Sequence, residues 1–197
     1  MRRSLLLAMA LLCGFSCVRA AESERYSEDA VKAVFLYRFT GFVDWPADGL
    51  PGPAFEFAVL GADAVGDALE RVLADHTVKG MPGRVRRIRS IRELGKAQLL
   101  YVESQSAADL SAVVQKTANA PVLLVSDLPH GLEIGSTVNF LLREQRVRFE
   151  VSLAAANRSG LRVSSELLAV ATRVVGSAAG DAERRLPAQL TPAAGGE

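Results

Sequence analysis

Apolar side chains recur at helical spacing in the segment that runs into Trp45 and Pro46. The positions that repeat every three or four residues are Val31, Val34, Phe35, Phe39 and Phe42. This spacing predicts an amphipathic helix, and five apolar side chains on one face need covering, so we expect this stripe in the core. Tyr37, Arg38 and Trp45 lie off the stripe. They are predicted to bind a partner, because these residue types often carry binding energy at interfaces.

Strand and helix patterns alternate along the rest of the chain. The segments with the composition of strands are 55–60, 84–91, 98–102, 122–125, 137–142 and 147–153. The further helical segments are 64–73, 106–118 and one that begins near Ser164 and includes Val174 and Val175. Unalternating apolar strands such as 122–125 are typical of a parallel sheet covered on both faces. We therefore predict a single compact α/β domain, with a mixed, mostly parallel sheet flanked by helices and a late antiparallel hairpin.

Arginines gather on two of the predicted strands. The first group is Arg84, Arg86, Arg87, Arg89 and Arg92. We interpret it as a charged edge strand that resists aggregation, with an acidic protein partner as the alternative. The hairpin poses the same choice, and there Arg143 and Arg146 are predicted to bind a partner. Arg148 should share a face with Arg146, because alternate strand residues do, and Phe149 should then point into the core.

The first twenty residues have the pattern of an export signal. A basic start precedes an apolar stretch that ends at Phe15 and is too short to span a bilayer, and cleavage is predicted after Ala20. Both cysteines, Cys13 and Cys17, lie inside this signal. The exported protein is therefore predicted to lack disulfides and cysteine metal sites. The predicted segments are a signal peptide over 1–20, an α/β domain over 21–177 and a disordered Ala/Gly/Pro-rich tail over 178–197.

Motifs of catalysis are missing from the sequence. A dinucleotide fingerprint would lie at Gly61, but Asp63 replaces its second glycine and would repel phosphate, so a tight turn with Asp63 as the helix cap is the preferred interpretation. His76 and His130 are the two histidines, and neither has a second histidine at ligand spacing. Basic and acidic side chains number 23 and 22, and export removes nucleic acid as a partner. We predict a protein that is not an enzyme and that uses no cofactor or metal.

One small-molecule hypothesis stays open as the alternative. Ligands of open α/β sheets bind beyond the carboxyl ends of the strands, and the polar residues expected there are Asp63, Ser126, Asp127 and His130. Polar residues are also ordinary in loops at this place. A small-solute site is therefore kept as the second interpretation.

The segment V-K-A-V-F-L-Y-R-F-T-G-F-V-D-W-P, residues 31–46, resembles the first block of the YfiR family of periplasmic regulators. Arg38 stands where the family usually has Asn. Further matching blocks are Val59–Gly61, Val125–Asp127, Arg146–Val151 and a closing block of Gly160–Leu161, Val163–Ser165 and Leu167–Leu168. The resemblance implies a compact α/β fold and a protein that inhibits a membrane-bound diguanylate cyclase by contacting its periplasmic domain, which lowers cyclic di-GMP output.

The resemblance also sets the expected partners and location. The expected partner is the periplasmic domain of a membrane signalling protein, either a diguanylate cyclase or a sensor kinase, and some family members are relieved by an OmpA-like lipoprotein. A homodimer stays open. The main functional prediction is an exported periplasmic regulatory binding protein, and the alternative is a periplasmic small-solute sensor that feeds a membrane sensor protein.

Overall fold

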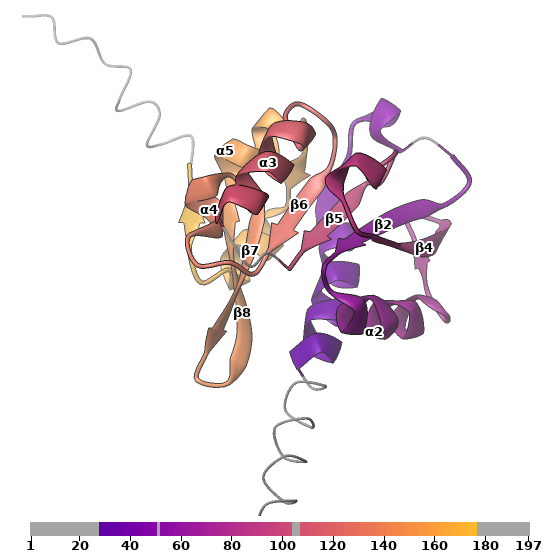
Figure 1. Cartoon of the computed structure of the whole chain (residues 1–197), viewed down its shortest axis with the longest axis horizontal. Helices are drawn as coiled ribbons and strands as arrows, with labels where there is room; N and C mark the ends of the chain where they lie inside the picture. The colour runs from indigo at the N-terminus through magenta and orange to yellow at the C-terminus, as the bar shows by residue number, and fades with distance from the viewer. Residues whose placement is uncertain (1–27, 51, 104–106, 177–197) are drawn as a thin grey trace, which may run out of the picture.

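An eight-stranded sheet forms the centre of the protein, with helices packed on both of its faces (Figure 1). The computed structural model describes residues 28–50, 52–103 and 107–176, so the predicted signal peptide and tail lie outside the described residues. The strands of this sheet are β2 (Phe55–Leu60), β3 (Thr77–Val78), β4 (Met81–Ile88), β5 (Leu99–Val102), β6 (Leu123–Ser126), β7 (Val138–Arg143), β8 (Arg146–Ser152) and β10 (Val174–Val175). A separate antiparallel pair joins β1 (Val43–Asp44) to β9 (Arg162–Val163).

The helices connect the strands and cover the sheet. The first, called the N-terminal helix below, occupies residues 28–42 of the described chain. The others are the 3-10 helices η1 (Ala47–Gly49) and η2 (Ile91–Glu93) and the α-helices α2 (Asp63–Leu73), α3 (Ala107–Thr117), α4 (Gly131–Ile134), α5 (Leu153–Arg158) and α6 (Ser165–Val170). None of the helices among the described residues combines the length and apolar character that a membrane span requires.

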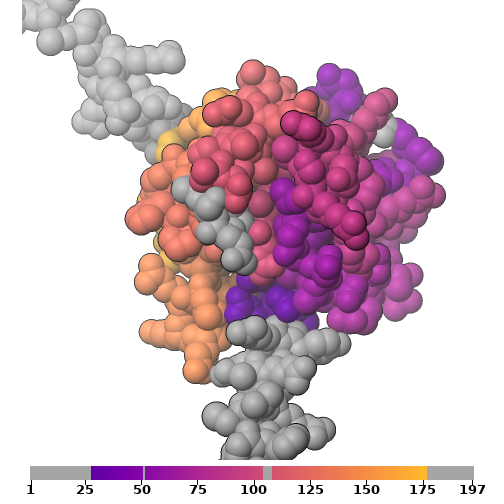
Figure 2. All heavy atoms as spheres, viewed as in Figure 1, coloured from indigo at the N-terminus to yellow at the C-terminus, as the bar shows by residue number. Residues whose placement is uncertain are grey.

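The strand order is β10-β8-β7-β6-β5-β2-β4-β3. The neighbours from β4 through β2, β5, β6 and β7 pair in parallel, whereas β7–β8 and β3–β4 are antiparallel. The predicted α/β class, with a mostly parallel sheet and a late hairpin, is confirmed. The hairpin turns at Glu144 and Gln145, which have positive φ angles of 51° and 59°. Figure 2 shows it in orange at the lower left, where it projects beyond the body of the domain.

Two hydrophobic cores lie on opposite faces of the sheet. Strand residues alternate between them, as the pleat requires: on β2, Phe57 and Val59 belong to one core and Ala58 to the other. The first core contains residues of the N-terminal helix and of α2. The second contains Leu110 and Val113 of α3. The sheet is therefore buried on both faces, which explains its unalternating apolar strands.

The end of the described chain differs from the prediction. The last helix was expected to reach Val175, but α6 ends at Val170 and the chain continues as β10 beside β8. Ala171 has an extended ψ of 141°, and the Thr172 amide donates to the Phe149 carbonyl at 2.8 Å. The open edge of β8 offers backbone partners that a longer helix could not use, and the β-branched Val174 and Val175 suit a strand. The capping prediction at Asp63 is also wrong, because Ala62 occupies the N-cap position of α2 without a side-chain bond.

Candidate functional site: an apolar groove along the N-terminal helix

The N-terminal helix has an apolar face on each of two sides. The side chains that it buries against the sheet are Lys32, Ala33, Leu36, Phe39 and Thr40. On the other side Val31, Val34 and Phe42 remain 40%, 44% and 37% exposed. The prediction of a single core stripe is thus wrong for these three residues and correct for Phe39. The sheet can cover only one side of a helix, so a second apolar side stays open to solvent.

This open side forms one wall of a groove of about 760 Å³. The opposite wall comes from Phe149 of β8 and from Leu167 and Val170 of α6. The residues that line the groove are Ala30, Val31, Val34, Phe35, Arg38, Phe39, Phe42, Phe149, Leu167 and Val170. Val170 is 68% exposed, the highest value among the large apolar side chains of the described residues. Contiguous exposed apolar surface of this kind marks interaction sites on soluble proteins.

Packed aromatic rings lie beneath the groove. The Phe39 ring centroid lies 5.9 Å from that of Phe35, 5.7 Å from that of Phe140 and 5.1 Å from that of Phe149. Edge and offset contacts at such distances stabilise aromatic clusters. The floor of the groove is therefore part of the hydrophobic core. A partner would meet a preformed surface, so binding would not have to order it.

Arg38 and Tyr37 occupy the rim of the groove and the surface next to it. Arg38 is exposed and lines both the groove and a smaller hollow of about 220 Å³ that also contains Tyr37 and Lys79. Tyr37 is half-buried, and its ring centroid lies 5.0 Å from that of His76. Both predicted partner-binding residues of the helix thus have accessible atoms next to concave surface.

Trp45 lies in a different environment from these two residues. It is only 8% exposed, its indole Nε1 donates to the Gln98 carbonyl at 3.2 Å, and its ring meets Phe55 edge-on at 5.2 Å. A buried Trp usually finds a partner for its N–H inside the fold. The structure therefore places Trp45 in the core, away from the surface that its predicted partner-binding role requires.

Arg143 and Arg146 face each other across the projecting end of the hairpin. Both are exposed, and the alternation of the strands puts them on the face opposite to Phe140 and Phe149. They are therefore separate from the groove. The predicted shared face of Arg146 and Arg148 and the inward direction of Phe149 are confirmed by this register and by the burial of the Phe149 ring.

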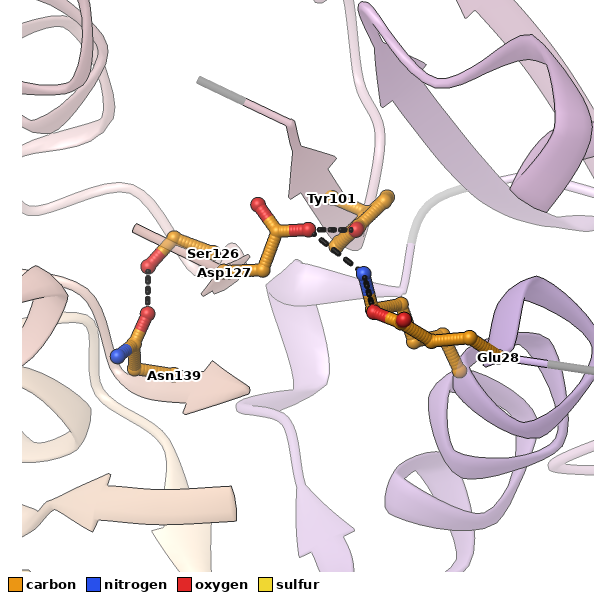
Figure 3. A network of polar contacts seen from close by, with 6 residues as sticks. Glu28, Tyr101, Ser126, Asp127 and Asn139 are labelled. Carbon is orange, nitrogen blue, oxygen red and sulfur yellow. Dashed lines mark hydrogen bonds and ion pairs between the residues drawn. The ribbon is translucent and has the colours of Figure 1, made fainter. Parts of the chain in front are cut away.

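A polar cluster ties the N-terminal helix to the carboxyl end of the sheet. Lys32 Nζ lies 2.8 Å from Glu28 Oε1 and 2.9 Å from Asp127 Oδ2, and the Tyr101 hydroxyl donates to the same Asp127 oxygen at 2.7 Å (Figure 3). Burial alone would lower the pKa of Lys32, but its bonds to Glu28 and Asp127 outweigh burial and raise it. The ammonium therefore stays charged, and Asp127 is held inside the fold.

Ser126 belongs to a second, buried chain of polar side chains. Its hydroxyl lies 2.7 Å from that of Ser136 and donates to Asn139 Oδ1 at 2.8 Å. Asn139 Nδ2 donates to Glu150 Oε1 at 3.1 Å, and Arg173 Nε donates to Glu150 Oε2 at 2.7 Å. Buried carboxylates need such partners. These hydrogen bonds hold together the start of β7, β8 near Glu150 and the segment before β10.

Gly131 allows the hydrogen-bonded side chains of Ser126 and Asn139 to pack closely against the backbone of α4. A Cβ atom at residue 131 would overlap Asn139 Oδ1 and Ser126 Oγ. The position is buried, so neither neighbour can move into solvent. Only glycine fits at the start of α4 while Asn139 and Ser126 stay bonded.

The four residues predicted for a small-solute site have unlike surroundings. Asp63 is exposed at the start of α2, and His130 is exposed with a left-handed φ of 62° just before α4. Ser126 and Asp127 bond to side chains of the fold, as described above. Among the described residues, no hydrogen bond or ion pair joins any two of the four. Across residues 28–50, 52–103 and 107–176, no group of three or more His, Cys, Asp or Glu side chains is placed so that it could hold a metal ion.

The fold and the groove together define the class of this protein as an α/β domain with an exposed apolar groove. The chain belongs to the YfiR/HmsC-like family, whose sequence profile matches residues 29–172. This family consists of periplasmic regulatory proteins. A comparison with curated proteins gives no significant match.

Two solved structures share part of the fold at low identity. One is an ABC domain in complex with L-Trp from Streptococcus pneumonia, with 10% identity, a TM-score of 0.46 and coverage of 61% of this chain and 55% of that chain. The other is a conserved domain protein from Vibrio cholerae O1 biovar El Tor, with 11% identity, a TM-score of 0.43 and coverage of 62% and 54%. The chain thus spans about half the length of each. Likeness at this level carries no argument about function.

Proposed function

We propose that this protein is an exported periplasmic regulator that binds the periplasmic domain of a membrane signalling protein and restrains it. The partner expected from the family is a diguanylate cyclase, so that binding lowers cyclic di-GMP. The observation that carries the proposal is the open apolar side of the N-terminal helix, because a protein that needs no partner gains nothing from exposing Val31, Val34, Phe42 and Val170 together.

The groove suits binding better than catalysis. The described residues of its lining include one charged side chain, Arg38, and no serine, cysteine, histidine or acidic residue, so they offer neither a nucleophile nor a general base. The small-solute alternative has less support. Ser126 and Asp127, which would have to contact the solute, already bond to Asn139, Lys32 and Tyr101.

A complementation experiment tests this function. Deleting the gene should raise cellular cyclic di-GMP, and reintroducing the wild-type gene should lower it to the original level. Val34→Asp places a charge in the groove at an exposed position. This variant should leave cyclic di-GMP high, because its carboxylate would have to be buried at the interface. Ala112→Asp is the matched control, since Ala112 is an exposed helical position on α3, over the other core. Unchanged cyclic di-GMP after deletion would refute the regulatory role.

Export has its own measurement. The mass of the protein recovered from the periplasmic fraction should correspond to a chain that begins at Ala21, because cleavage is expected after Ala20. Recovery of the protein only in the cytoplasm, with residues 1–20 still attached, would contradict the proposed location.

A further inference from the structure

The long wall of the groove has the length of a short α-helix. Its long wall runs along the N-terminal helix from Val31 to Phe42, and the exposed side chains Val31, Val34, Arg38 and Phe42 follow one another at three- and four-residue steps. At 1.5 Å per residue this wall is roughly 16 Å long, about three helical turns. The second wall includes the short helix α6. A trough between two helices is the place where an amphipathic helix docks through residues at i, i+3, i+4 and i+7.

The charge of the groove adds a condition on the occupant. Among the described residues that line the groove, Arg38 is the only charged one. No hydrogen bond or ion pair is found between its guanidinium and any other described residue. An occupant that covers Arg38 without supplying an acid would bury an unpaired cation, which is unfavourable. A carboxylate can instead form two parallel hydrogen bonds with the guanidinium.

The same condition disfavours a second copy of this chain as the occupant. A two-fold symmetric contact places the same patch on both subunits. Two grooves facing each other would cover both Arg38 side chains, and the described lining residues contain no acid to pair with either of them. Burying an unpaired cation is unfavourable.

We infer that the groove binds a three-turn amphipathic α-helix of the membrane signalling partner, with an Asp or Glu of that helix paired to Arg38. This inference rests on the proposed function and specifies the part of the partner that is recognised. Val31, Val34, Phe42 and Val170 contact the apolar side of the helix. Arg38 sets its register, because only one position along the helix can place the acid against the guanidinium.

The test begins with photocrosslinking in the source cells. The photoreactive residue p-benzoylphenylalanine replaces Val34 in one variant and Val170 in another, so that the two walls are probed separately. Mass spectrometry of the crosslinked peptides should give the same partner segment from both walls, with apolar residues at helical spacing and one Asp or Glu. Capture of residues 177–197, of a second copy or of a segment without an acid would overturn the inference.

A charge exchange then tests the pairing. A synthetic peptide of the captured segment should bind wild-type protein and lose at least tenfold in affinity to Arg38→Glu. A peptide with its acid replaced by arginine should recover binding to Arg38→Glu. Lys116→Glu is the matched control, since Lys116 is an exposed cation on α3, over the other core, and it should bind like wild type. Equal affinity of Arg38→Glu and wild type would refute the pairing.

The two proposals can fail separately. If deletion of the gene changes cyclic di-GMP but the charge exchange shows no recovery, the regulatory function stands and the helix inference fails. If the charge exchange restores binding but the captured helix belongs to a protein without a signalling domain, the groove still binds an amphipathic helix through an acid paired with Arg38. The proposed regulatory function then fails.

Discussion

Phe39→Ala should destabilise the protein far more than Phe42→Ala, although the two residues lie one turn apart on the same helix. Phe39 is fully buried among three other rings, so its truncation removes buried area and leaves a cavity, which costs about 3–5 kcal/mol. Phe42 is 37% exposed. Because complete burial of Phe contributes about 1.5–3 kcal/mol, its partial burial is worth roughly 1–2 kcal/mol, and water fills the space that it leaves.

Urea unfolding of the two purified variants measures this difference. The midpoints give the two losses in free energy of unfolding, provided that the slope with urea stays equal to that of the wild type. Binding of the captured partner peptide should show the reverse order, with Phe42→Ala weakening it more than Phe39→Ala at temperatures where both variants are folded. If Phe42→Ala lost as much stability as Phe39→Ala, the helix would bury its groove-facing side and the assignment of the groove would be wrong.

Three other changes test the polar and backbone features. Asp127→Asn should cost about 2–4 kcal/mol in urea unfolding, because the buried Lys32 loses one of its two carboxylates, and a loss below measurement error would contradict this role. Gly131→Ala should cost about 1–3 kcal/mol through overlap with its buried neighbours, so an unchanged melting temperature would show that they can move. Replacing Glu144 and Gln145 by Asn and Gly should stabilise the hairpin by about 1–2 kcal/mol, since both positions have positive φ, and slower amide exchange on β7 and β8 would be the sign of it.

Six of the eight strands of the sheet were predictable, because most of them are buried on both faces and carry long apolar runs, whereas the two-residue strands β3 and β10 were not. Runs such as Leu123–Ser126 are apolar almost throughout, and the hairpin shows alternation with a turn in the expected place. The N-terminal helix was predictable in extent but not in orientation. Val34 and Leu36 have similar hydrophobicity, yet Val34 is exposed and Leu36 is buried. Spacing cannot select the buried side when a helix is apolar on both sides.

The polar networks were harder to find for a related reason. Lys32 stands between Val31 and Ala33, and the only local sign of its role is Glu28 four residues earlier, a spacing that favours an ion pair on a helix. Asn139 and Glu150 sit on strands where polar residues normally face water. Their burial depends on the register between β7 and β8 and on Arg173 from a later segment. Pairings between residues so far apart in the sequence cannot be predicted from local sequence patterns.

The bond between Arg173 and Glu150 also has a consequence for the length of a stable fragment. The family profile stops at residue 172, one residue before the cation that neutralises a carboxylate that is only 4% exposed. A recombinant fragment cut at that boundary would keep Glu150 buried without its arginine and would strip β10 from the edge of β8. Arg173 is 44% exposed, so water screens part of this pair, but the buried Glu150 would still lose the cation beside it. We therefore expect a stable fragment to need the residues through Val175, and a fragment cut at residue 172 to be less stable.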